Sequence, residues 1–182
     1  TEVLAVVKAN AYGHGLADCA LALEKAGARW LGVTCVEEGV VLRRVCPDAR
    51  ILILSSLCAE EADTVIDHRL TPVVWELPHL IWLEAAAKKR ELRAGDLPVH
   101  LEIDTGMSRQ GTAQEQIEPL RQHFGPASPL QMEAIMSHFP SPENPEATQE
   151  QELSFAGAVE AITASGLRPI SGRVRAEARR PK

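Results

Sequence analysis

Short apolar runs rich in β-branched residues alternate along the chain with longer amphipathic stretches. Runs such as ILIL at 51–54 are apolar at every position, as a strand must be when both faces of its sheet are covered. This pattern predicts six strands, at residues 3–7, 30–34, 51–54, 71–75, 99–104 and 130–137. The stretches between them carry apolar residues at helical spacing, which predicts helices at residues 16–26, 36–46, 59–68, 78–90, 114–123 and 148–165.

Six consecutive strand-then-helix units predict a parallel sheet with helices outside it. Two architectures fit, an open doubly wound sheet and part of an eight-stranded barrel. Polar residues close strand after strand, namely Lys8, Glu37, Asp104 and His138. A barrel places its chemistry along that rim, whereas an open sheet gathers ligand contacts at one switch point. We therefore predict an α/β fold, an incomplete (β/α)8 TIM-type barrel with about six units.

The clean pattern occupies residues 1–169, which we expect to form one partial barrel domain. It stops at GLRP, and the following ISGRVRAEARRPK at 170–182 has neither strand nor helix periodicity. We expect this basic segment to be a disordered tail. The acidic stretch at 143–152 is interrupted by prolines and predicts a solvated loop leading into the last helix.

The composition and charge of the chain argue against several classes of protein. Aromatic residues are only 4%, so the core must be built mainly from Ala, Val, Leu and Ile. A net charge of −6 argues against a nucleic-acid partner, which requires a concentrated cationic face. The four cysteines lack C-x-x-C spacing, so we expect reduced thiols and no metal site. No apolar run approaches the roughly 20 residues of a membrane span, and we expect a soluble, cytoplasmic protein.

The stretch AVVKANAYGHG at 5–15 carries the candidate chemistry. Lys8 ends the first strand, and a neutral lysine amine can form an imine with an aldehyde cofactor or act as a base. Gly13 and Gly15 allow close backbone approach, and the helix beginning near Leu16 would offer free N–H groups to an anion. These features suit a phosphate-bearing aldehyde such as pyridoxal phosphate. A structural lysine before a glycine-rich turn is the alternative.

This string resembles the pyridoxal-phosphate signature of alanine racemases essentially letter for letter. Four further motifs follow in the family's order, WLGVTCVEEGVVLR, LTPVVW, LEIDTGMSRQG and MSHF. The resemblance covers about residues 3–169 and ends after GLRP, where the family continues into a His-x-Ala-Asn-Ser-type strand. It implies a barrel with pyridoxal 5'-phosphate as cofactor, and interconversion of L- and D-alanine for peptidoglycan. It also implies a homodimer for the full-length parent, with a C-terminal β domain that this sequence lacks.

The resemblance also implies roles for individual residues. Lys8 would hold the cofactor and serve as one of two catalytic bases, Tyr12 would hydrogen-bond the phosphate, and Val6 would line the cofactor floor. Arg109 would contact the phenolic oxygen of the cofactor and the carboxylate region of the substrate, for which a planar, always charged guanidinium is suited. His138 would lie beside the cofactor ring.

One position departs from the common family pattern. Many members carry a carbamylated lysine where this chain has Glu102, seven residues before Arg109. The carboxylate of Glu102 would supply an anion that orients Arg109 without needing carbon dioxide. Its shorter side chain would place the charge differently.

The family's second base is a tyrosine in a later domain that acts across the dimer. This chain contains one tyrosine, Tyr12, which the resemblance already assigns to the phosphate. We therefore expect the 182-residue chain to be weakly active or inactive alone. Three alternatives stay open: a serine-preferring or broad-specificity racemase, a single-domain pyridoxal-phosphate-binding barrel, and a non-catalytic remnant.

Overall fold

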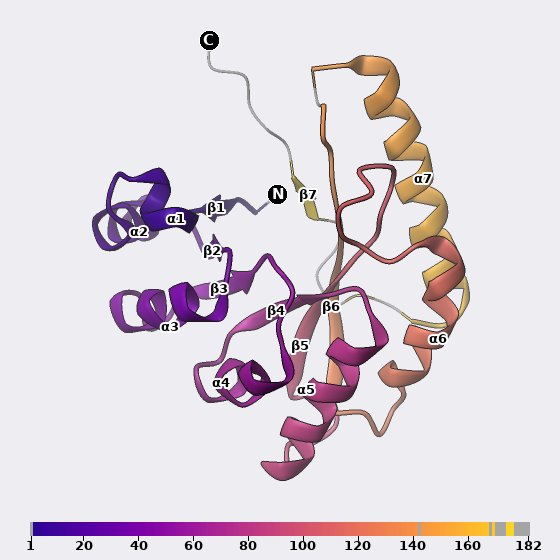
Figure 1. The fold of residues 1–182 in the computed structure, drawn as a ribbon, viewed down its shortest axis with the longest axis horizontal. Coiled ribbons are helices and arrows are strands. Elements are labelled where there is room, and N and C mark those ends of the chain that lie inside the picture. Colours follow the sequence, from indigo (N-terminus) through magenta and orange to yellow (C-terminus); the bar gives the residue numbers. More distant parts are fainter. Residues whose placement is uncertain (1, 142, 168, 170–173, 177–182) are drawn as a thin grey trace. The chain divides into compact units, whose positions relative to one another are not determined.

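The computed structural model describes residues 2–141, 143–167, 169 and 174–176. The chain divides into two compact units, Thr1–Val73 with Trp82–Glu91, and Val74–Ile81 with Leu92–Lys182 (Figure 1). Helix α5 (Leu77–Lys89) is shared between them. Each unit is described by itself below.

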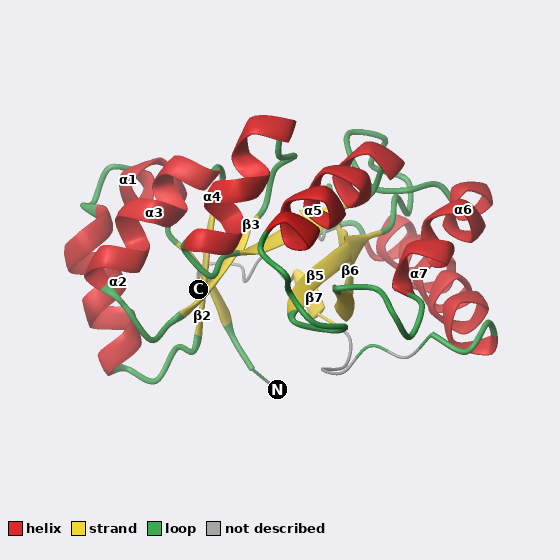
Figure 2. Cartoon of the chain, turned by 90° about the horizontal axis from the view of Figure 1, so that it is seen from below, coloured by secondary structure: helices red, strands yellow, loops and turns green. Residues whose placement is uncertain are grey.

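The first unit is built on parallel strands whose order follows the chain: β1 (Leu4–Val6), β2 (Trp30–Val33), β3 (Arg50–Ile53) and β4 (Thr71–Val74). Between them lie α1 (Lys8–Tyr12), α2 (Leu16–Lys25), α3 (Val36–Val45), the 3-10 turn η1 (Ala59–Glu61) and α4 (Ala62–Asp67). Figure 2 shows α2, α3 and α4 together on one side of the strands.

The core of this unit lies between the strands and these helices. Strand β2 is buried at every position, and Ile51, Leu52 and Ile53 of β3 are fully buried. Helix α3 packs closely on β3 because residue 39 is glycine. A Cβ built on Gly39 would lie 2.7 Å from Cδ1 of Ile53.

The second unit contains β5 (Leu97–Glu102), β6 (Leu130–His138) and β7 (Val174–Ala176), again parallel and in chain order. Its helical segments are η2 (Gln114–Gln116), α6 (Ile117–Arg121), η3 (Gln122–Phe124) and α7 (Pro145–Ala164). The register of β5 on β6 shifts between Val99 and His100, so that Glu133 is an additional residue in β6.

The strand order decides between the two predicted architectures. An open doubly wound sheet reverses its order at a switch point, whereas neighbouring strands of a barrel follow the sequence. Within each unit the order is sequential and the strands are parallel, which confirms the incomplete (β/α)8 TIM-type barrel. All six predicted strands and all six predicted helices are present. The helix predicted at 59–68 is divided into η1 and α4, and the helix predicted at 114–123 into η2, α6 and η3.

Two segments differ from the sequence-based expectation. The acidic stretch predicted as a loop is mostly helix, because α7 begins at Pro145. The side chain of Asn144 caps it by accepting hydrogen bonds from the backbone N–H groups of Glu146 and Ala147, at 3.1 and 3.2 Å. Within the predicted disordered tail, Val174–Ala176 forms β7 through pairing with β6. The rest of that tail, 170–173 and 177–182, lies outside the described residues, and the domain limit at 169 stays a prediction.

Within the part of the chain that the structure describes, no helix is both long enough and apolar enough to span a membrane.

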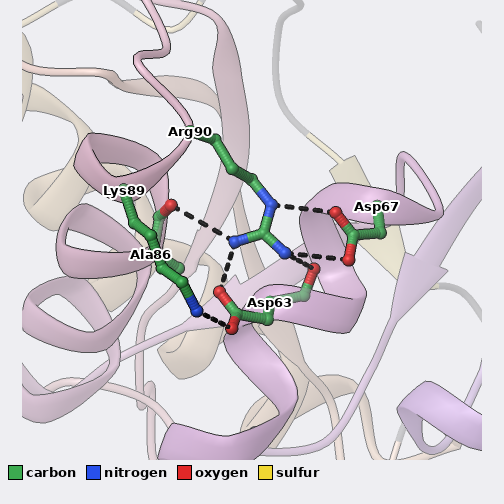
Figure 3. Close-up of polar contacts among 5 residues, drawn as sticks. All are labelled: Asp63, Asp67, Ala86, Lys89 and Arg90. Atoms are coloured by element: carbon green, nitrogen blue, oxygen red, sulfur yellow. Dashed lines mark hydrogen bonds and ion pairs between the residues drawn. The ribbon is translucent and has the colours of Figure 1, made fainter.

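A charged network joins α4 to the end of α5 in the first unit (Figure 3). The guanidinium of Arg90 donates to both carboxylate oxygens of Asp67 at 2.8 Å, and to the carboxylate and carbonyl oxygens of Asp63. Lys89 also donates to the Asp63 carboxylate, at 2.8 Å. Hydrogen bonds from Lys89 and Arg90 lower the pKa of Asp63, and the bond from Arg90 lowers the pKa of Asp67.

We predict that Arg90→Gln lowers the thermal unfolding temperature at neutral pH and that this effect fades in acid. The pKa values of Asp63 and Asp67 are depressed in the folded chain, so their contribution is present above the ordinary value of 3.8 and is lost as the pH falls through the depressed values. Circular dichroism melts from neutral pH into acid measure this. Arg44→Gln, at an exposed position of α3, is the charge-matched control. Equal melting curves for the two variants at neutral pH would contradict the prediction.

Candidate functional site

Lys8 lies two residues after the end of β1 and is the first residue of α1, a turn with unusual backbone geometry. The N–H of Val7 donates to the carbonyl of Gly32 at 2.8 Å, which continues the pairing of β1 with β2 as far as Val7. The four residues after Lys8, Ala9 to Tyr12, all have positive φ, between 51° and 55°. Left-handed conformation costs roughly 1–2 kcal/mol for each residue with a Cβ. Strain of this kind persists only where surrounding contacts enforce it.

Asn10 fixes the second half of this turn. Its carbonyl accepts from the N–H groups of Gly13 and Gly15 at 3.1 and 3.0 Å. Its side-chain Oδ1 accepts from the N–H of Leu16, the first residue of α2, at 2.8 Å. Of the N–H groups expected to be free at the start of α2, the one of Leu16 is therefore already bound by Asn10.

Glu38, in the first turn of α3, fixes the first half of the turn that follows Lys8. Its Oε1 accepts from the N–H of Ala9 at 2.7 Å, and its Oε2 accepts from the N–H of Thr34 at 2.8 Å. One carboxylate thus links the residue after Lys8 to the residue after β2. The acid expected at this strand end from the sequence was the neighbouring Glu37, whose pKa is lowered by hydrogen bonds from its own backbone N–H and from the Cys35 side chain. Two adjacent glutamates after a strand were the only sequence signal, and it does not tell them apart.

The predicted cofactor residues of the first unit are accessible. Lys8 is half-buried between the buried Val7 and the exposed Ala9. The side chain of Tyr12 is 61% exposed and that of Val6 36% exposed. The amine and the phenol can therefore both reach a ligand, while the roles assigned to them stay predictions.

In the second unit, Arg109 lies on a closed loop at residues 103–112. The ends of the loop pair with each other, because Asp104 N–H donates to the Thr112 carbonyl at 3.0 Å and Thr112 N–H donates to the Glu102 carbonyl at 2.8 Å. Inside it, Oδ1 of Asp104 accepts from the N–H of Ser108 at 3.0 Å. Arg109 itself is exposed, directly after Ser108, which has a positive φ of 55°.

Glu102 is the buried acid at the base of this loop, 2% exposed. Its Oε2 accepts a hydrogen bond from Nε2 of Gln110 at 2.6 Å. Burial raises the pKa of Glu102, while the bond from Gln110 and the charge of Arg109 lower it. The expectation that Glu102 orients Arg109 stays a prediction. Gln110 was not predicted from the sequence, where its only signal is its place beside Arg109 in the motif.

His138 is the last residue of β6 and is half-buried. The preceding Ser137 shares a hydrogen bond of 2.6 Å between its hydroxyl and that of Thr105, on the Arg109 loop. Nε2 of Gln151 in α7 donates to the same Thr105 hydroxyl at 3.3 Å. These buried contacts hold the loop against the end of β6, and the role of His138 toward a cofactor stays a prediction.

The described residues contain no group of three or more His, Cys, Asp or Glu side chains that could hold a metal ion.

The candidate site residues fall into two sets, one in each unit. Lys8, Tyr12 and Val6 lie in the first unit, and Glu102, Arg109 and His138 lie in the second.

Comparison with known proteins gives consistent matches. Residues 1–174 match the family model described as alanine racemase, N-terminal domain. A curated alanine racemase from Thermodesulfovibrio yellowstonii is 32% identical over 169 residues, which are 93% of this chain and 45% of that protein. The crystal structure of alanine racemase from D-cycloserine-producing Streptomyces lavendulae is 28% identical with a TM-score of 0.87, covering 97% of this chain and 46% of that one.

A histidine racemase from Leuconostoc mesenteroides shares the fold, with a TM-score of 0.85 at 22% identity, over 96% of this chain and 46% of that one. The chain thus spans somewhat less than half the length of the proteins it matches.

We predict that Glu102→Gln changes how stability depends on pH. The pKa of Glu102 in the folded chain lies above its ordinary value of 4.5, so its stabilising contribution is complete below that pH and is lost as the pH rises through the raised value. Glutamine cannot ionise and avoids this loss. The melting temperature of the variant relative to the unsubstituted chain should therefore rise from acid to neutral pH, with the exposed Glu115→Gln as control. A constant difference across this range would contradict the prediction.

We predict that Gly111→Ala opens the Arg109 loop. Gly111 has φ +104°, and a Cβ there would lie 2.5 Å from the backbone nitrogen of Asp104 and 2.8 Å from the backbone carbon of Ile103. Strain and overpacking of this kind cost on the order of 2–4 kcal/mol. Hydrogen exchange at the Thr112 amide should accelerate together with a lower melting temperature. Gly125→Ala, where a Cβ meets nothing within 4 Å, should leave both unchanged.

Proposed function

The chain belongs to the alanine racemase family, and we propose that its function is the pyridoxal-phosphate-dependent interconversion of L-alanine and D-alanine. The observation that carries the proposal is the position of Lys8. This lysine stands at the carboxyl end of a parallel strand and is followed by four left-handed residues held by contacts from α2 and α3. Strain that the fold maintains beside a reactive side chain is typical of functional sites.

The donor set fits pyridoxal phosphate. The accessible Lys8 amine suits the cofactor aldehyde, and the exposed Tyr12 hydroxyl suits its phosphate. Gly13, with φ +88° and open space where a Cβ would lie, leaves its backbone accessible beside them. When bound, the cofactor supplies an electron sink for the negative charge that develops when the α-proton of the amino acid is removed.

Lys8 would have two tasks in our proposal. Its amine would hold the cofactor through the aldehyde group, and the same nitrogen would take or return the α-proton on one face of the amino acid. Racemisation requires a base on each face. The single tyrosine of this chain, Tyr12, is assigned to the phosphate, so we assign the second base to no residue of the 182.

The second unit supplies a cation and a histidine. We propose that Arg109 contacts the phenolic oxygen of the cofactor and the carboxylate of the substrate, because a guanidinium stays charged and presents directed donors. Glu102, held by Gln110, places a buried acid at the base of the loop that carries Arg109. His138 would lie beside the cofactor ring, and Val6 would line its floor.

We further propose that the D-alanine supplies peptidoglycan synthesis, that the enzyme works in the cytoplasm, and that the full-length parent is a homodimer.

A serine-preferring or broad-specificity racemase is the second candidate function. It is favoured by the histidine racemase that shares this fold, because the same scaffold there serves an amino acid with a different side chain. Exchange of the α-proton of L-alanine, L-serine and L-histidine in deuterated water, with added cofactor, separates these candidates by which amino acid exchanges fastest.

We predict that borohydride reduction of the chain with pyridoxal phosphate labels Lys8. Peptide mapping by mass spectrometry should place most of the label there, and Lys8→Arg should lower the yield by about tenfold or more, since arginine cannot form the bond. Lys25→Arg, at an exposed position of α2, should leave the yield unchanged. Label spread evenly over surface lysines, with Lys8→Arg no different from Lys25→Arg, would overturn the proposed function.

A further inference from the structure

We propose that Glu38 is a positioning residue for Lys8, resting on the proposed function of that lysine as the cofactor anchor. The carboxylate of Glu38 would hold the start of the left-handed turn and so fix the direction in which the Lys8 amine leaves the sheet. No motif in the sequence pointed to this role.

The contacts on either side of Lys8 carry the argument. Before it, Val7 is 2% exposed, and its N–H is bound to the Gly32 carbonyl of β2 at 2.8 Å. After it, the N–H of Ala9 is bound to Oε1 of Glu38 at 2.7 Å. Lys8 therefore lies between two anchored backbone groups, one held by the sheet and one held by α3.

The other carboxylate oxygen of Glu38 binds the end of β2 and so holds the Glu38 side chain in place. Oε2 accepts from the N–H of Thr34 at 2.8 Å, at the end of β2. Strands β1 and β2 are paired, with Val6 opposite Gly32, so the carboxylate connects the ends of two neighbouring strands. Hydrogen bonds to an ionised acceptor are shorter and stronger than those between neutral groups. They are suited to holding a turn that is strained in four consecutive residues.

Glu37 provides a matched comparison within the same helical turn. It carries the same charge beside the same helix N-terminus, where an acid is favourable whatever it contacts. Its own backbone N–H and the Cys35 side chain lower its pKa, whereas the N–H groups of Ala9 and Thr34 are bound to Glu38. An effect of Glu38 that Glu37 does not share must therefore come from the contacts with Ala9 and Thr34.

The test compares Glu38→Gln with Glu37→Gln in the full 182-residue chain. A glutamine side chain has nearly the same shape but only one acceptor oxygen, and its NH₂ group can only donate. Glu38→Gln can therefore satisfy either Ala9 N–H or Thr34 N–H, but not both. The readouts are hydrogen exchange at those two amides, exchange at the Arg50 amide as a reference within the same sheet, and the borohydride-fixed yield of pyridoxal phosphate on Lys8.

In Glu38→Gln we expect exchange at Ala9 or Thr34 to accelerate by about tenfold, as loss of one charge-assisted hydrogen bond implies, with a similar drop in Lys8 labelling. The Arg50 amide, bound to the Arg29 carbonyl at 3.0 Å, should keep its exchange rate, and Glu37→Gln should match the unsubstituted chain in every readout. Equal Lys8 labelling in the two glutamine variants would overturn the positioning role alone. Absence of Lys8 labelling from the unsubstituted chain would overturn the proposed function and this inference with it.

A second variant covers the case in which Glu38→Gln fails to fold. Glu38→Asp keeps both acceptor oxygens but withdraws them by one methylene group. Lower Lys8 labelling with unchanged Arg50 exchange would support the positioning role. Unchanged labelling in a folded Glu38→Asp chain, with the Ala9 and Thr34 amides exchanging faster, would overturn it.

Discussion

The candidate site of the first unit depends on one backbone constraint, the run of four left-handed residues that follows Lys8. None of the four is glycine, so the turn exists only because neighbouring elements stabilise it. Its start is held by the Glu38 carboxylate from α3, and its end by Asn10, which bonds to the first residue of α2. The sheet, the two helices and the backbone around Lys8 are therefore parts of a single arrangement.

The second unit places its candidate residues in a similar way. The Arg109 loop is closed by pairing of its own ends around Glu102 and Thr112, and it is closed so tightly that position 111 admits only glycine. Below it, Glu102 is buried with Gln110 as its hydrogen-bond partner. In both units an exposed or half-buried charged side chain is carried by a backbone segment whose own contacts are fixed. Because the backbone makes the fixed contacts, the charged groups stay accessible to a ligand.

The elements of regular structure were predictable from the sequence because buried parallel strands and amphipathic helices leave clear periodicities. Lys8 and Arg109 were selected from the sequence because their motifs are long and specific, and their roles stay predictions. The left-handed turn was not predictable, since of its four residues only Asn10 adopts that conformation readily, and a run of four is caused by tertiary contacts. The same limit explains why Glu37 was selected in place of Glu38, and why Val174–Ala176 was not predicted as a strand, since its pairing with β6 leaves no local pattern.

The central claim is that the fold holds Lys8 as a cofactor anchor through the strained turn behind it. A crystal structure of the chain after borohydride reduction with pyridoxal phosphate tests this most directly. We predict electron density for the reduced cofactor continuous with Nζ of Lys8, with Ala9 to Tyr12 left-handed and the Glu38 carboxylate on the N–H groups of Ala9 and Thr34. Density on other lysines, or a relaxed right-handed turn after a labelled Lys8, would contradict the account.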